Sequence, residues 1–413
     1  MSKPAAILLL VGFISIFKVA LVGVLTAGEI LFIAAFPFML INIIRYISKD
    51  PLLKKVFLLW LAYLVAQIIS DLIRQTPAVD YQRGWAKIAI LGLNLSMLVY
   101  ISRQQLKTLI WYFWGSALGT LFLVVVLNGD IIGSWKFILG PSISILASLL
   151  LYQVNINKVY KGALYITLGI LHVFLNCRSL GAITILSGFI FLLPEKYTSR
   201  VSVNQLFDAK YIGSIALMIL TIYFSYTYSV THGYLGDEAK DKHEQQTSNG
   251  KNVILGARSE IASSLMAISE SPIIGHGSWA KDKELVHVFL EYYGVEEDSY
   301  GAQEMLTLGL IPTHSHLFGA WVEAGLFGFI FWAVMFRYAF LALLSYIRLK
   351  VIPYRLTYMF VLTIFLWDLL FSPFDTERRM SNAAILVLCY VAVTLPKHIK
   401  PIRIPKLQLQ EQL

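Results

Sequence analysis

The sequence predicts an all-α polytopic membrane protein, a class indicated by its composition, the length of its apolar runs and the distribution of its positive charge. Of its 413 residues, 57% are hydrophobic and 14% are charged, and the mean hydropathy is +0.67. A soluble globular domain is closer to a quarter charged. Apolar runs of membrane length recur along the chain, and about 20 helical residues cross the hydrocarbon core of a bilayer. Barrel strands would alternate over about 10 residues instead.

The apolar runs predict about twelve membrane-spanning helices. The N-terminal run has no small-residue cleavage site, so we expect a retained first helix and not a cleaved signal. Only Arg178 separates two of the runs, and the sequence leaves open whether these are separate helices. The predicted spans are 5–24, 27–47, 56–73, 86–102, 108–127, 139–155, 161–177, 179–194, 211–229, 318–346, 355–373 and 381–396.

Positive charge on the short loops predicts the orientation. With the N-terminus inside, the inner segments hold 19 lysines and arginines and the outer short loops hold 7. This bias places both chain ends in the cytoplasm and accounts for the net charge of +9 without a nucleic-acid partner. The expected divisions are nine helices in 1–229, one large, partly helical periplasmic loop in 230–317, three helices in 318–396 and a basic cytoplasmic tail in 397–413.

The segment from Pro312 to Gly328 carries the strongest functional signal. His314 and His316 stand where the polar loop meets an apolar run, and Glu323 follows inside the apolar pattern. Titratable groups at a membrane boundary are costly unless they have partners or a function. Ala320, Ala324 and Gly328 recur every four residues, which predicts one helix face that a neighbour can approach closely.

Several kinds of chemistry have no motif in this chain. The sequence has no P-loop, no dinucleotide-binding glycine pattern, no His-Glu-x-x-His and no cysteine pair at zinc spacing. Cys177 and Cys389 both lie at or in apolar runs, so no disulfide framework is indicated. We therefore expect no cofactor and no metal, and any substrate should arrive already activated.

A lipid diphosphate-linked glycan would be such a substrate. Its lipid lies in the bilayer, its diphosphate at the interface and its sugar outside. Transfer to a hydroxyl needs a base, and histidine titrates near neutrality. It also needs cations for the departing diphosphate, and arginine binds phosphate through a planar fork. Five of the seven outer positive charges are arginines.

Three motifs resemble the superfamily of bacterial O-antigen ligases and O-antigen polymerases. His314-Ser315, nine residues and then Gly325-Leu326-Phe327-Gly328 are similar to its His-[Asn/Ser/Gln]-x9-Gly-x-x-Gly signature. Arg258, followed by a Pro272-x-x-Gly275-x-Gly277 turn, is similar to its loop motif. Asn176-Cys177-Arg178-Ser179 resembles its Ser-Arg-Gly element, although Cys177 replaces the usual serine and Leu180 precedes the glycine.

The resemblance implies a metal-independent, inverting glycosyltransferase of the bacterial inner membrane with a GT-C-like fold and a periplasmic active site. His314 would be the catalytic base or would orient the acceptor, and Arg178 and Arg258 would bind undecaprenyl diphosphate. The expected supporting residues are Ser315, His316, Glu323, Gly325, Gly328 and His276. We expect Glu323 to pair with an arginine, because nine residues of helix place it too far from His314 for a hydrogen bond.

The resemblance also implies the partners and leaves alternatives open. The donor is an undecaprenyl-diphosphate-linked glycan, and membrane lipid and a chain-length regulator are further partners. In a polymerase, the reading that we favour, the acceptor is another lipid-linked repeat unit, whereas in a ligase it is lipid A–core. A flippase of lipid-linked glycans is a third interpretation, but one large loop after the ninth helix breaks the inverted symmetry expected of a transporter. The sugar, its linkage and the oligomeric state are not determined by the sequence.

Overall fold

The computed structural model describes residues 1–20, 23–103, 105–128, 130–131, 133–193, 224–225, 227–234, 236–247, 259–293, 299–349 and 352–398. The first half contains α1 (Lys3–Ile14), β1 (Lys18–Ala20), β2 (Val24–Thr26), α2 (Ala27–Ser48), α3 (Pro51–Arg74), α4 (Ala78–Ser102), α5 (Leu106–Leu121), the π-helices η1 (Phe122–Asn128) and η2 (Trp135–Leu139), α6 (Gly140–Gln153), α7 (Lys158–Phe174) and α8 (Arg178–Leu192). The second half contains α12 (Asp237–Thr247), α14 (Ser259–Glu270), α15 (Lys283–Tyr293), α16 (Tyr300–Leu308), α17 (His316–Ala324), α18 (Leu326–Arg348), α19 (Arg355–Phe371) and α20 (Thr376–His398).

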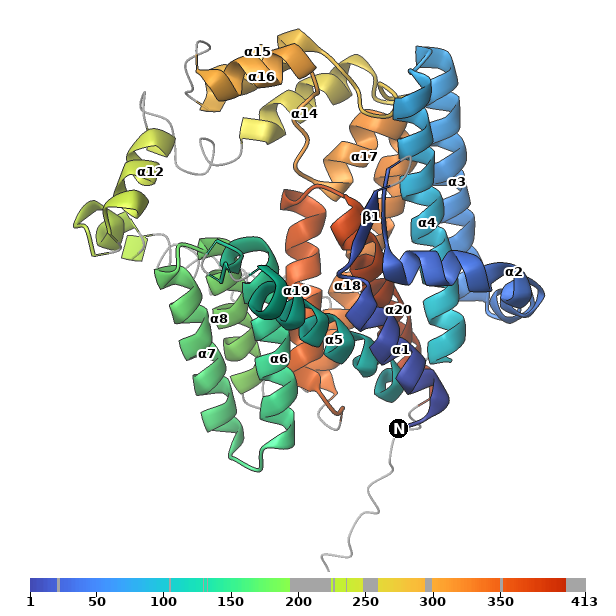
Figure 1. Cartoon of the computed structure of the whole chain (residues 1–413), viewed down its shortest axis with the longest axis vertical. Coiled ribbons are helices and arrows are strands. Elements are labelled where there is room, and N and C mark those ends of the chain that lie inside the picture. The colour runs from blue at the N-terminus through green and yellow to red at the C-terminus, as the bar shows by residue number, and fades with distance from the viewer. Residues whose placement is uncertain are drawn as a thin grey trace, which may run out of the picture.

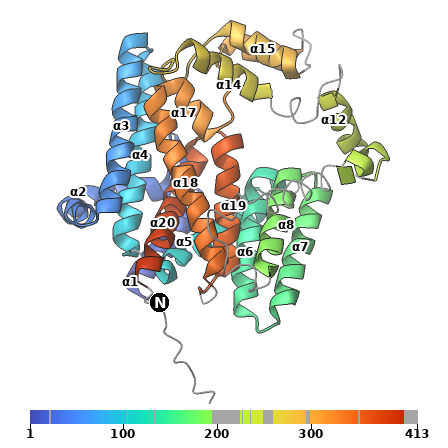
Figure 2. The ribbon, with the colours of Figure 1, turned by 180° about the vertical axis from the view of Figure 1, so that it is seen from behind.

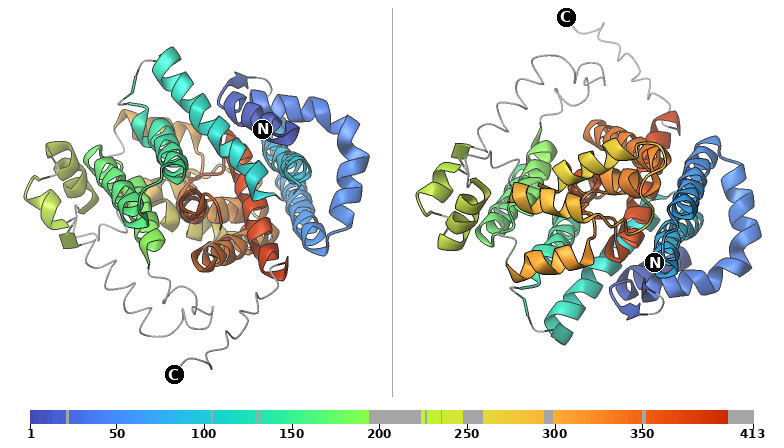
Figure 3. Two further views of the ribbon diagram at one scale, coloured as in Figure 1. Left: turned by 90° about the horizontal axis from the view of Figure 1, so that it is seen from below. Right: turned by 90° about the horizontal axis from the view of Figure 1, so that it is seen from above.

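The helices form a bundle with a cap at one end. Figure 1 shows α14, α15 and α16 together at the end of the molecule away from the N-terminus. Figure 2 shows α14 and α15 from behind, above α17 and level with the upper ends of α3 and α4. In Figure 3, α2 bends around the outside of the bundle, crosswise to α3 and α4, and Pro37 lies inside this helix, where proline removes a backbone hydrogen bond.

The opposite end of the bundle is defined by contacts between helix termini. The Tyr358 hydroxyl donates to the carbonyl of Leu106 at the start of α5. The Gln153 amide at the end of α6 donates to the hydroxyl of Tyr354, just before α19. Asp50, just before α3, accepts a hydrogen bond from Tyr390 of α20. The starts of α5 and α19 and the end of α6 therefore meet at the end of the bundle away from the cap, and the start of α3 is held to α20.

The described part of the chain contains six helices that are long and apolar enough to cross a membrane. These are α2, α3, α4 and α18, together with the continuous segments Leu106–Leu127 and Trp135–Gln153. The chain is thus an all-α protein with the length and composition of a multi-pass membrane protein. Most of the predicted span 211–229 lies outside the described residues.

The first predicted span is not one helix. We expected a helix over 5–24, but α1 ends at Ile14 and the short antiparallel pair β1–β2 follows. The Ser15 hydroxyl donates to the carbonyl of Val11 at the end of α1, and Lys18 then forms an ion pair with Glu377 of α20. A lysine with a carboxylate partner gains more from this turn than it would inside an apolar helix.

Two further expectations concern breaks in helices. The runs 161–177 and 179–194 are separate helices, α7 and α8, because Asn176 adopts a left-handed φ of 59° between them. The predicted span 318–346 is divided into α17 and α18 at Gly325, whose φ of 67° and ψ of −152° are not helical. We expected Ala320, Ala324 and Gly328 to form one helix face, but the break at Gly325 prevents this. Ala320 packs across the break against Gly328.

A buried ion pair joins the two ends of the chain. Thr26 and Glu29 form a capping box that starts α2, and both oxygens of Glu29 then accept hydrogen bonds from Arg379 of α20, at 2.8 and 2.9 Å. Asn94 of α4 donates to the same carboxylate at 3.1 Å. Glu29 is fully buried and Arg379 nearly so. This pairing fixes α2, α4 and α20 together.

Removing the Glu29 charge should destabilise the bundle. Glu29→Gln leaves the Arg379 guanidinium buried without its counter-charge, a change that typically costs about 3–5 kcal/mol. We expect a large fall in the thermal unfolding midpoint of the protein in detergent or nanodiscs. Glu377→Gln is the matched control, because it breaks the exposed pair with Lys18 and should cost less than about 1 kcal/mol. Equal shifts in the two variants would contradict the assigned importance of the buried pair.

Candidate functional site

His314 stands one residue before the cap of α17, at the loop end of the bundle. Ser315 is the N-cap of this helix, and its hydroxyl accepts a hydrogen bond from the backbone N–H of Phe318 at 3.1 Å. The same hydroxyl donates to the carbonyl of Leu369 near the end of α19 at 2.9 Å. A serine that both caps α17 and binds α19 fixes the backbone next to His314.

The His314 side chain is accessible and has a carboxylate beside it. Its exposed fraction is 53%, and its Nδ1 atom lies 3.8 Å from Oε1 of Glu260 on α14. That distance suits an ion pair and is too long for a hydrogen bond. A small hollow separates α14 from the ends of α17 and α19, and its lining consists of Glu260, Ile261, Ser264, His314, Ser315, Phe318, Leu370 and Phe371.

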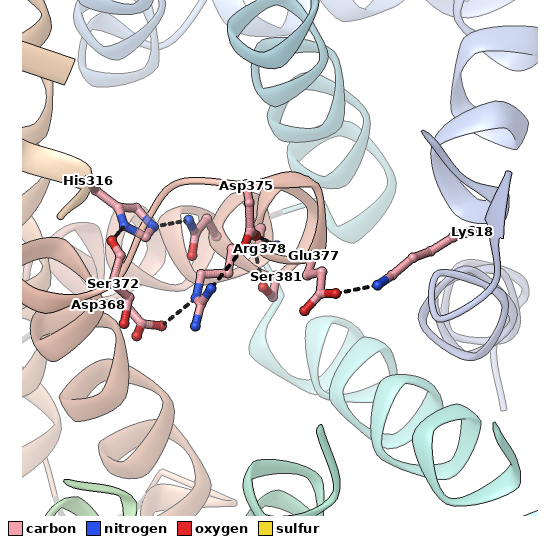
Figure 4. Close-up of polar contacts among 9 residues, drawn as sticks. Lys18, His316, Asp368, Ser372, Asp375, Glu377, Arg378 and Ser381 are labelled. Atoms are coloured by element: carbon pink, nitrogen blue, oxygen red, sulfur yellow. Dashed lines mark hydrogen bonds and ion pairs between the residues drawn. The ribbon is translucent and has the colours of Figure 1, made fainter. Parts of the chain in front are cut away.

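His316, unlike His314, is enclosed by the protein. It is fully buried, and Figure 4 shows both of its ring nitrogens engaged. Nδ1 lies 2.7 Å from the carbonyl of Ser372, so Nδ1 carries the proton, and Nε2 accepts a hydrogen bond from Asn382 of α20 at 2.7 Å. A neutral imidazole with both nitrogens used has no lone pair left for a substrate. Of the two histidines, His314 is the one that can exchange a proton with a bound molecule.

The surroundings of His316 keep it neutral. Its pKa is lowered to about 3, mainly by burial and also by the positive charges of Arg378 and Lys87, against the opposing effect of the hydrogen bond to Ser372. Arg378 itself lies between Asp368 and Asp375, at 3.6 and 3.2 Å (Figure 4). His316 therefore has a structural role and joins α17 to α20 through hydrogen bonds.

Helices α14 and α17 run side by side and are joined at both ends. At the end that carries His314, the hydroxyls of Ser263 and Ser264 donate to the carbonyl of Pro312 at 3.3 and 3.4 Å. At the other end, the backbone N–H of His276 donates to the carbonyl of Val322 at 2.7 Å. The His276 ring completes the junction through Nε2, which lies 2.7 Å from the carbonyl of Ala267. His276 is thus a supporting residue that ties the two helices together.

Glycines make this junction possible. Gly325 has a φ of 67°, and a Cβ atom there would lie 2.0 Å from the carbonyl oxygen of Ile273. At Gly275, with a φ of 84°, a Cβ would lie 2.6 Å from the carbonyl oxygen of Glu323. At Gly328 it would lie 2.3 Å from the carbonyl oxygen of Ala320. The Pro-x-x-Gly-x-Gly turn and the Gly-x-x-Gly pair, far apart in sequence, therefore pack directly against each other.

We expected Glu323 to pair with an arginine, but its partner is a lysine. Its carboxylate lies 2.5 Å from Nζ of Lys87 on α4, and both side chains are mostly buried. The expectation was wrong because α4 places Lys87 beside Glu323, a pairing that nothing local in the sequence indicated. The backbone carbonyl of Glu323 also accepts hydrogen bonds from the Ser70 hydroxyl and the Gly277 N–H, at 2.9 and 3.0 Å.

Of the two predicted diphosphate ligands, Arg178 lies within the described residues and Arg258 does not. Arg178 is the first residue of α8, and α8 and α17 both pack against α19. Burial lowers the pKa of His243 in α12, and the charge of Arg178 lowers it further, which places Arg178 within electrostatic range of α12. Arg258 lies outside the described residues. It immediately precedes α14, whose second residue, Glu260, lies beside His314.

The loop is attached to the bundle by a polar stripe on α3. Its members are Gln67, Ser70, Asp71 and Arg74, at positions i, i+3, i+4 and i+7, which share one helix face. Each of them donates or accepts a hydrogen bond with the segment 271–278 or with Glu323. The spacing of these polar residues is the sequence signal that would have indicated a docked loop.

Glu260 is the other residue that the sequence did not single out. Only the pairing of α14 with α17 brings it to His314, across 54 positions of the chain.

Comparison with known proteins adds nothing to these assignments: a scan against protein-family models gives no match, and a search of curated proteins finds no similar sequence.

A Cβ atom at Gly325 should disrupt the junction. Gly325→Ala forces a methyl group onto the carbonyl of Ile273 in a backbone conformation that essentially only glycine adopts, a strain of about 1–3 kcal/mol before the clash is counted. We expect a lower unfolding midpoint and faster proteolysis of the loop. Gly319→Ala on the same helix is the control, because its Cβ would be 3.4 Å from Thr313 Oγ1 and not closer to other atoms. Similar stability of both variants would argue against the close packing at Gly325.

Acid should weaken the fold through His316. Its pKa is about 3 in the folded protein and near 6.5 in an unfolded chain, so the unfolded state binds the proton first as the pH falls. Stability should therefore be full above about pH 6.5 and decline below it, by up to about 1.4 kcal/mol per pH unit. Unfolding midpoints of the wild type and His316→Gln at pH 7 and pH 5 test this. A drop of the same size in both proteins would show that another group causes it.

Proposed function

We propose that this protein transfers an undecaprenyl-diphosphate-linked oligosaccharide to an acceptor hydroxyl at the periplasmic face of the bacterial inner membrane. The favoured reaction is polymerisation of repeat units of O-antigen or another surface polysaccharide. The observation that carries the proposal is the exposed His314 imidazole with the Glu260 carboxylate 3.8 Å from Nδ1. These two groups stand at the loop end of a bundle of long apolar helices, where a lipid-borne sugar would be presented.

His314 has the geometry of a general base. With Nδ1 directed to the Glu260 carboxylate, Nε2 is the nitrogen left to accept the proton of the acceptor hydroxyl. The hydroxyl oxygen then forms a bond to the anomeric carbon while the bond from that carbon to the diphosphate oxygen breaks. The bonding pair leaves with the diphosphate, and the proton remains on His314. The carboxylate stabilises the imidazolium that this step creates.

The departing diphosphate needs fixed positive charge, for which the candidates are Arg178 and Arg258. Arginine offers a planar donor fork that lysine lacks. The supporting observation for Arg258 is its place in the chain, two residues before the carboxylate that contacts His314. The support for Arg178 is its place at the start of α8, a helix that packs on α19 as α17 does.

Ligation to lipid A–core uses the same chemistry, because only the acceptor differs. The glycan profile of a deletion strain separates the two reactions. Loss of long chains with one repeat unit retained on the core indicates a polymerase. Polymer stranded on its lipid carrier indicates a ligase.

His314→Ala should abolish transfer without unfolding the protein. We expect at least a 100-fold loss of product in proteoliposomes supplied with a lipid diphosphate-linked repeat unit, because a positioned base contributes about 10²–10⁴-fold. EDTA is present throughout, because the proposed chemistry uses no metal. Glu260→Gln should lose less, since the base remains.

His287→Ala is the control for that experiment. His287 is an exposed histidine on α15, and its replacement should leave transfer and the unfolding midpoint unchanged. Full activity of the His314→Ala protein would exclude the role assigned to His314. Wild-type activity that appears only when EDTA is omitted would show that the reaction depends on a metal ion.

A further inference from the structure

The polar stripe on α3 holds an unusually complete set of contacts around one carboxylate. Asp71 has an exposed fraction of 3%. Its Oδ1 accepts the backbone N–H of Ser278 at 2.6 Å, and its Oδ2 accepts the Ser278 hydroxyl at 2.8 Å and the indole N–H of Trp85 at 2.7 Å. Gln67 donates to Ser278 and, at 3.4 Å, to Asp71. Both oxygens of the buried Asp71 carboxylate are thus hydrogen-bonded, and such directional bonds make a buried network rigid.

The chain is shaped to bring Ser278 into this notch. Gly277 has a φ of 85°, and a Cβ there would lie 2.4 Å from Thr76 Oγ1. On the other side, a Cβ at Gly84 of α4 would lie 1.9 Å from the Ser278 hydroxyl oxygen. Both neighbours of the Ser278 side chain therefore lack a side chain of their own, and the serine is enclosed between α3 and α4.

Arg74 makes a second attachment one turn further along α3. Its Nε donates to the carbonyl of Gly275 at 2.9 Å, and its Nη2 donates to the hydroxyl of Ser271 at 2.6 Å. Ser271 directly follows α14. Asp71 and Arg74 thus form hydrogen bonds to both halves of the turn 271–278. This turn follows α14 and contacts the end of α17 that lies away from His314.

We propose that Asp71 and Arg74 are positioning residues, which set the distance between His314 and Glu260 by fixing the angle between α14 and α17. The two helices share the attachment at the turn 271–278, and at the His314 end the only hydrogen bonds that join them, within the described residues, are the longer ones of Ser263 and Ser264 to Pro312. Twelve residues of α14 are about 18 Å long, so a tilt of about 3° at the turn moves Glu260 by about 1 Å. A displacement of that size can cost about 100-fold in rate.

The inference rests on the role proposed for His314, but it can be measured without the transfer reaction. Diethylpyrocarbonate modifies accessible imidazoles, and the modification rate of His314 in the full-length protein can be followed by peptide mass spectrometry. Glu260→Gln sets the reference, because it removes the carboxylate beside the ring. Asp71→Asn keeps an acceptor for the Ser278 N–H but faces an amide N–H₂ to the Trp85 and Ser278 donors.

We expect Asp71→Asn and Arg74→Gln each to raise the His314 modification rate at least two-fold, as Glu260→Gln does, with no further rise when either is combined with Glu260→Gln. Asp80→Asn is the matched control, since it breaks a more exposed pair with Lys281 of the same loop, at 3.1 Å, and should not alter the rate. Arg74→Gln serves as the second variant if Asp71→Asn does not fold.

The outcomes separate the two proposals. Unchanged His314 modification in a folded Asp71→Asn or Arg74→Gln protein overturns the positioning role, whatever the transfer activity. Rises that add fully to that of Glu260→Gln overturn it as well, because residues acting through one contact are not additive. If modification changes as expected but the wild type transfers no glycan, the positioning role stands and the proposed function fails. In an active protein, we expect Asp71→Asn to lower kcat at least ten-fold with KM within about two-fold.

Discussion

A helix that lies outside a bundle can be held only from one side, and this constraint governs the whole loop end of the molecule. Helix α14 has α17 beside it, and α17 in turn rests on α3 and α19. The turn 271–278 is bound to α3 by the hydrogen bonds of the Asp71 carboxylate and the Arg74 guanidinium. Apolar packing alone would leave the helices free to slide, whereas directional bonds to buried groups allow a single arrangement.

The two histidines of the Pro-Thr-His-Ser-His segment illustrate how a cap separates two environments. The N-cap Ser315 is extended, with a φ of −153° and a ψ of 137°, and the histidines on its two sides lie in different surroundings. His316 enters the interior and is held by Ser372 and Asn382. His314 faces the hollow beside Glu260. One histidine fixes the backbone, and the other is left available for a proton.

The sequence indicated the helical class and left open the break near Arg178, which the structure shows. The glycine motifs were readable because glycine alone tolerates the conformations at Gly275 and Gly325. Partnerships between distant residues could not be read, since nothing local connects Glu260 with His314 or Lys87 with Glu323. The first span was misjudged because hydropathy does not show that Lys18 has a partner, Glu377, near the other end of the chain.

The Glu29–Arg379 pair has a consequence for the order of biogenesis. Helix α2 leaves the ribosome early, but its buried carboxylate receives its cation only when α20, the last helix described, has been made. Until then the Glu29 carboxylate lacks its partner, and the intermediate must be tolerated in the bilayer while the 350 positions between Glu29 and Arg379 are synthesised, on the order of 18–70 s at ~5–20 residues per second. Truncation near the C-terminus would therefore leave the earliest part of the protein unfinished, and quality control would detect the defect at the opposite end of the chain from its cause.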